Sequence, residues 1–195
     1  MWRSILFFSL AGLIVPNFSD YLYYYQMNVT KLSKLEYSML ALFGFVALML
    51  SSLIYNWCFK NVEERILLSL AMIVNFLGSV MTLVYVLEKT GGIPPFVFLA
   101  LTSTVTDTIF LAMSNLPSMV LFAKLIPSQI ESSMFAVLMG LLNLSHTVLA
   151  KLLGNFYNSF VGVSNDNLGD IWKLYCIACG LTILPLAFVW LLPTK

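Results

Sequence analysis

The apolar positions of this chain fall into six long runs, which are separated by shorter polar stretches. Each run holds roughly 20 residues or more, the length that an α-helix needs to cross a bilayer. The first run carries Asp20 and is too long for a cleaved signal peptide, so we interpret it as a membrane helix. The pattern therefore predicts six transmembrane helices, at about residues 5–27, 37–58, 66–87, 96–122, 133–153 and 171–192.

The composition agrees with this pattern. Of the 195 residues, 60% are hydrophobic and 10% are charged, and the mean hydropathy is +0.91. Soluble domains carry about 25% charged residues, so we expect an all-α, multi-pass integral membrane protein surrounded by membrane lipid. The net charge of +1 gives no reason to expect a nucleic-acid partner. The balance of Lys and Arg between the two ends does not fix the orientation, and the host membrane is not indicated.

A polar stretch at residues 88–95, E-K-T-G-G-I-P-P, is the clearest break between the runs. It divides a single transmembrane domain, residues 1–195, into two blocks of three helices, residues 1–90 and 91–195. Two such blocks are similar to the inverted repeats that build each six-helix half of a major facilitator transporter. The first helix of each block carries an acid, Asp20 in one and Asp107 in the other.

Asp107 lies near the middle of the fourth predicted crossing. A carboxylate at this depth costs roughly 2.5–3.5 kcal/mol on insertion scales, so its side chain should face protein or water rather than lipid. Two interpretations fit: Asp107 locks two helices together through a hydrogen bond to Ser or Thr, or it lines a solute path. Acids inside membranes are functional by default, so the solute path is our working hypothesis. Asn115 falls near the same helical face and joins it as a candidate.

Further candidates for a substrate or proton path lie on the first and fifth helices. Asp20 and Tyr24 fall near one face of the first helix, within a group of tyrosines. That group suits either an aromatic belt at the membrane interface or stacking against an aromatic solute. Asn143 lies on the fifth helix beside His146, the single histidine. His146 is either a proton relay or a hydrogen-bonded packing residue.

The sequence gives little support for enzyme chemistry. Cys58, Cys176 and Cys179 are odd in number, so they predict no disulfide framework. The last two have redox or metal spacing, but they lie in an apolar segment without a second ligand pair, which favours ordinary packing. No nucleotide-binding loop and no nucleophile–base motif is present. We therefore expect no enzyme activity, no metal and no cofactor.

Three charged residues near the predicted loops are candidates for gate or loop contacts: Arg65, Lys124 and Glu131. With both termini in the cytoplasm, these residues would lie at the cytoplasmic ends of the helices. Glu131 has an alternative role, because a negative charge at the start of the fifth helix suits the helix dipole.

A family resemblance follows from the fourth and fifth helices. The chain has Asp107, then N-L-P-S-M-V-L-F-A-K-L-I-P at residues 115–127, Glu131, and F-A-V-L-M-G-L-L-N at residues 135–143. This order resembles the folate–biopterin transporter family of the major facilitator superfamily. The first helix is also similar, in Pro16, Asp20, Tyr24 and Asn28, and so are Tyr55 and Asn56 with Arg65 after the second helix.

The resemblance covers only the C-terminal six helices of a transporter that normally has twelve. It implies alternating-access transport of a small organic solute, a pteridine such as folate or biopterin, with proton coupling as an open point. It also implies a second six-helix half, supplied by a second copy, by a separate N-terminal half or by residues upstream. The alternative is a non-transporting six-helix remnant, or a partner subunit of a full-length carrier.

Overall fold

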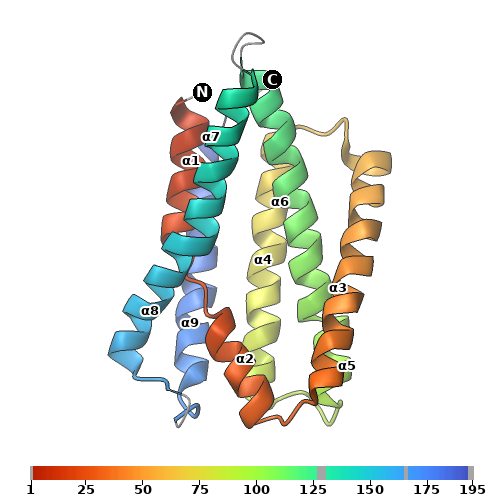
Figure 1. Ribbon diagram of the computed structural model, residues 1–195, viewed down its shortest axis with the longest axis vertical. Helices are drawn as coiled ribbons and strands as arrows, with labels where there is room; N and C mark the ends of the chain where they lie inside the picture. The colour runs from red at the N-terminus through yellow and green to blue at the C-terminus, as the bar shows by residue number, and fades with distance from the viewer. Residues whose placement is uncertain (1, 127–130, 165–166, 193–195) are drawn as a thin grey trace.

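The computed structural model describes residues 2–126, 131–164 and 167–192, and these residues fold into a bundle of helices (Figure 1). Among these described residues, η1 and η3 are π-helical and η4 is a 3₁₀-helix. In chain order the elements are α1 (Trp2–Ile14), α2 (Ser19–Asn28), α3 (Lys34–Ile54), η1 (Tyr55–Phe59), α4 (Glu64–Val86), α5 (Pro95–Leu101), α6 (Ser103–Leu125), α7 (Glu131–Asn143), η3 (Leu144–Leu149), α8 (Ala150–Val161), α9 (Ile171–Thr182) and η4 (Leu184–Leu191).

Within the described residues, five helical stretches are long and apolar enough to cross a membrane. They correspond to the second to sixth predicted helices, and they confirm an all-α integral membrane protein. Their bounds are Lys34–Phe59, Glu64–Val86, Pro95–Lys124, Ser132–Val161 and Ile171–Leu191.

The prediction of one continuous first helix is wrong. Residues 15–18 separate α1, with 13 residues, from α2, with 10 residues, so neither part reaches the length of a crossing. Pro16 lies in this interruption, and proline both lacks a backbone donor and disfavours helix at the preceding residue. The apolar pattern continues across the interruption, which is why the pattern alone does not reveal it.

The bundle has α4 and α6 side by side in its centre, and α3 packs on the outer side of α6 (Figure 1). The interrupted first helix, α7 and α9 lie on the other side of α4, and the two chain ends are at the same end of the bundle. Two clusters of buried apolar side chains hold the helices together. One contains Phe18, Tyr85 and Tyr175, and the other contains Phe7 and Phe122, among other residues.

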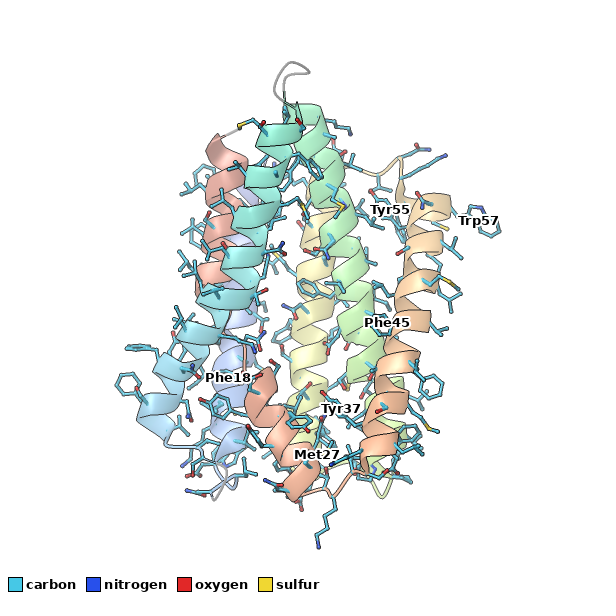
Figure 2. All side chains as sticks on the ribbon, viewed as in Figure 1. Phe18, Met27, Tyr37, Phe45, Tyr55 and Trp57 are labelled. Carbon is cyan, nitrogen blue, oxygen red and sulfur yellow. The ribbon has the colours of Figure 1, made fainter. Side chains whose placement is uncertain are left out.

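The outer face of α3 and η1 exposes large apolar side chains. Phe45 is 71% exposed and Trp57 is 92% exposed. Figure 2 shows Trp57 pointing away from the bundle, whereas Tyr55, two residues earlier, is buried on the side toward α6. Exposed apolar patches of this kind mark a membrane interaction surface, so this face of α3 suits contact with lipid.

Candidate functional site

A cavity of ≈ 510 Å³ lies between the two apolar clusters, and its lining includes residues from both. Its walls come from the interrupted first helix, α4, α6, the helix that runs from α7 through η3 to α8, and α9 with η4. Pockets for small molecules usually have volumes of about 300–1,000 Å³. The cavity is therefore large enough for a small organic molecule.

The walls of the cavity are chemically divided. Phe7, Phe8, Phe110 and other apolar side chains supply one kind of surface. The polar side chains come mainly from the middle of three helices: Asn75 and Ser79 on α4, Asp107, Ser114 and Asn115 on α6, and Asn143, His146 and Thr147 on α7 and η3. A cavity that combines aromatic walls with a few amide and carboxyl groups suits a flat ligand with polar edges.

Three of the side chains predicted to contact solute meet in this cavity. Asp107 and Asn115 come from α6 and Asn143 comes from α7, the next α-helix along the chain, and all three residues are exposed to the space. Among the residues that the structure describes, none of these three side chains makes a hydrogen bond. Their donors and acceptors are therefore available to water or to a ligand.

Asp107 reaches the cavity at a place where α4 and α6 approach each other closely. A Cβ atom added to Gly78 of α4 would lie 2.8 Å from Thr106 Oγ1 and 3.3 Å from Asp107 Oδ1. The Thr106 and Thr108 hydroxyls donate to backbone carbonyls of their own helix rather than to Asp107. The absence of a side chain on Gly78 thus allows α4 to pack directly against the helix that carries Asp107.

The interruption of the first helix also contributes to the cavity, and the sequence interpretation missed this feature. Pro16, Asn17 and Ser19 line the space. The Asn17 amide N–H donates to the Ala150 carbonyl at 2.9 Å, and Asn17 Oδ1 accepts from the Ser19 amide at 2.9 Å. Irregular backbone at membrane depth is tolerated where it is buried in protein or lines a cavity. The available signal was Pro16 followed by Asn17 inside an apolar run.

A second irregular segment faces the same space. The helix that begins at α7 becomes π-helical over Leu144–Leu149 before it continues as α8. His146 and Thr147 belong to this segment, and Asn143 directly precedes it. Short π-helical segments within α-helices occur frequently at functional sites. Nothing in the apolar periodicity of residues 133–153 predicts the change in helix type.

Asp20 and Tyr24 lie outside the cavity lining, on the exposed side of α2. Both carboxylate oxygens of Asp20 accept from Lys151 Nζ of α8, at 2.9 and 3.0 Å. The Tyr24 ring packs edge-on against the Tyr23 ring, with centroids 5.7 Å apart. The two acids that the sequence placed in corresponding helices therefore occupy different surroundings.

The predicted gate or loop residues lie near the end of the bundle that carries both termini. Lys124, near the end of α6, forms an ion pair with Glu64, the first residue of α4. Arg65 follows Glu64 directly, and the sequence interpretation had not singled out Glu64. Glu131 begins α7, but its side chain and residues 127–130 lie outside the described part of the chain.

The cysteines are separate from this site. Cys58 and Cys176 are exposed, Cys179 is half-buried, and all three are free thiols. In the described parts of the chain, no group of three or more His, Cys, Asp or Glu side chains is arranged to hold a metal ion.

Comparisons with known proteins give the family of this chain. The chain is 26% identical over 195 residues to probable folate-biopterin transporter 4 of Arabidopsis thaliana, a match that covers 99% of this chain and 39% of that protein. It is 24% identical over 194 residues to folate transporter 1 of Plasmodium falciparum, covering 98% of this chain and 38% of that protein. It is 28% identical over 142 residues to a folate-biopterin transporter of Synechocystis, covering 72% of this chain and 28% of that protein.

The chain thus spans about two fifths of the length of the first two relatives. These relatives are named as transporters rather than as enzymes, in agreement with the expectation from the sequence. No solved structure matches the chain. The model of the BT1 family matches residues 1–195, so this multi-pass membrane protein belongs to the BT1 family, as the resemblance of its fourth and fifth helices predicts.

Proposed function

We propose that this chain forms a six-helix part of a membrane transporter that moves a pteridine-type organic solute by alternating access. The observation that carries the proposal is the cavity, where Asp107, Asn115 and Asn143 present unpartnered polar groups beside aromatic walls. A flat heterocycle with polar edges matches both kinds of surface. The names of the relatives, which are folate or folate-biopterin transporters, support the same class of solute.

The proposed architecture has six crossings, in which α1 and α2 together make one interrupted crossing. The arrangement of the chain supports an even number of crossings, because both termini are at one end of the bundle (Figure 1). The two blocks, residues 1–90 and 91–195, then form two three-helix repeats. Interrupted helices beside the substrate site are common in secondary transporters, where the free helix ends interact with the solute or the coupling ion.

Asp107 is the proposed centre for proton or solute contact. Its carboxylate enters the cavity without a cationic partner among the described side chains that line the space. A carboxylate in this position can take up a proton or accept hydrogen bonds from ring nitrogens of a solute. Proton-coupled transport is therefore the form of transport that this residue suits.

The functional unit is proposed to contain twelve helices. The Asp20 and Lys151 side chains are 64% and 42% exposed. Asp20 lies on α2 and Lys151 lies on α8, and both of these helices also contribute residues to the cavity lining. Placing such charges against hydrocarbon is unfavourable by several kcal/mol. A second copy, a separate N-terminal half or upstream residues would shield the Asp20 and Lys151 side chains from lipid. A monomer that transports a pteridine unaided in vesicles, with its mass measured in mild detergent, would contradict this arrangement.

Uptake into proteoliposomes tests the proposed function. Vesicles contain the chain, either alone or with a six-helix partner. An inward proton gradient is imposed, and radiolabelled folate or biopterin is added outside. We expect the parent protein to take up the solute and Asp107→Asn to show no uptake. We also expect calorimetry to detect binding of the solute to the parent protein. Binding without uptake under all conditions would favour a partner subunit of a carrier. The absence of both binding and uptake would refute the proposed solute class.

A further inference from the structure

The interruption of the first helix is fixed in place by α8, through contacts that involve backbone atoms. The Asn17 amide donates to the Ala150 carbonyl at 2.9 Å. A Cβ atom added to Gly154, one helical turn later, would lie only 2.3 Å from the Asn17 carbonyl oxygen. Any side chain at position 154 would therefore push the interruption away from α8. The segment that this contact fixes contains Asn17, which lines the cavity.

Polar side chains extend the same contact along α2. Lys151 Nζ donates to Asp20 Oδ1 at 2.9 Å. The Tyr21 hydroxyl donates to Asn155 Oδ1 at 2.9 Å and accepts from Asn158 Nδ2 at 3.0 Å. Lys151, Asn155 and Asn158 are spaced by four and three residues, so they share one face of α8. This polar seam joins the helix after the interruption to the helix after the π-helical segment.

The other side of α2 has a different character. The Phe18 and Tyr25 side chains are buried in an apolar cluster with Tyr85 and Tyr175. The Tyr25 hydroxyl also donates to the Val86 carbonyl of α4 at 3.2 Å. This side therefore holds α2 against α4 and α9, and its directional bond joins α2 to α4 rather than to α8. The polar seam supplies the directional contacts between α2 and α8.

We propose that Asp20, Lys151 and Gly154 are positioning residues, which hold the interruption of the first helix against α8 so that Asn17 and Ser19 face the cavity. In this role Asp20 acts through Lys151 and does not contact the solute. The inference rests on the proposed transport function for its effect on solute, whereas the positioning itself is measurable without solute. It differs from the sequence-based hypothesis, in which Asp20 belongs to the substrate or proton path.

Hydrogen–deuterium exchange of the complete chain in detergent tests the positioning directly. In Lys151→Gln, we expect the peptide that contains residues 15–19 to exchange about two- to fivefold faster, the size expected from losing an ion pair whose two side chains are 42% and 64% exposed. Gly154→Ala should produce the same local change. Gly140→Ala is the matched control, because an added Cβ at Gly140, in the same crossing, has no atom within 4 Å. Unchanged exchange in both Lys151→Gln and Gly154→Ala would overturn the proposal.

Charge reversal separates a positioning role from a direct role in transport. Asp20→Asn should raise the KM for uptake, because the cavity wall shifts, and should speed exchange at residues 15–19. The double variant with Asp20→Lys and Lys151→Asp should restore both quantities to within about twofold of the parent, since the ion pair reforms. Loss of uptake in Asp20→Asn with normal exchange, and no recovery in the double variant, would assign Asp20 a direct role and overturn the proposal. If the chain alone shows no uptake, the exchange data still decide the positioning.

Discussion

Gly78→Ala should weaken both the packing of α4 against α6 and the binding of solute. The added methyl would lie 2.8 Å from Thr106 Oγ1, which is 0.6 Å less than the 3.4 Å at which ordinary van der Waals contact begins. Thr106 cannot rotate away without loss, because its hydroxyl bonds to the Thr102 and Ser103 carbonyls at 3.1 and 3.0 Å. The two helices must therefore separate, and Asp107 moves with α6.

The expected size follows from this overlap. Inserting a methyl group into a well-packed contact costs about 1–3 kcal/mol. We expect a loss of stability in this range, measured as a lower midpoint of thermal unfolding in detergent. We also expect solute affinity to fall about two- to tenfold if half of this cost appears in the bound state, because 1.4 kcal/mol corresponds to a factor of ten. Calorimetric titration with folate or biopterin measures the second quantity.

A matched substitution separates packing from the general effect of replacing glycine. Gly180→Ala on α9 adds the same methyl group where no atom lies within 4 Å. Replacing glycine by alanine in a helix interior stabilises the helix by roughly 1 kcal/mol where no clash occurs, so this control should be as stable as the parent or more stable. If Gly78→Ala matched the control in both stability and affinity, the close approach of α4 and α6 would not be needed to position Asp107.

Three further predictions follow from the site and from the ends of the bundle. Asp107→Asn should abolish uptake without lowering the amount of inserted protein, and normal uptake would show that Asp107 is a packing residue. Lys124→Gln should change stability by less than about 1 kcal/mol, because the ion pair with Glu64 is half exposed at the Lys124 side chain; a larger fall in the unfolding midpoint would contradict this. Single cysteines near the two chain ends, with Cys58, Cys176 and Cys179 replaced by serine, should react with an impermeant thiol reagent from the same side of the membrane.

Much of the fold was predictable because hydrophobic thickness constrains helix length. Five of the six predicted runs are single stretches long enough to cross a membrane. Lipid cannot satisfy backbone hydrogen bonds, so an apolar run of this length forms an α-helix, which satisfies them within the segment. The same reasoning brought Asp107 and Asn115 to one face of α6, where both line the cavity. Helical spacing also places Asn75 and Ser79 of α4 near one face, but nothing in the sequence indicates that this face shares a cavity with Asp107.

The position of Asp20 shows where helical spacing ceases to be a guide. Spacing places Asn17, Asp20, Tyr24 and Asn28 on one face only if one helix contains them all. Asp20, Tyr24 and Asn28 belong to α2 and are all exposed, so their shared face exists. Asn17 precedes α2, in the interruption, and it lines the cavity instead. After an interruption, the angular position of a side chain around the helix axis no longer follows from its spacing to residues before the interruption. The acid of the first block therefore lies in the polar seam with α8, whereas Asp107, which together with Asn115 belongs to α6, lines the cavity.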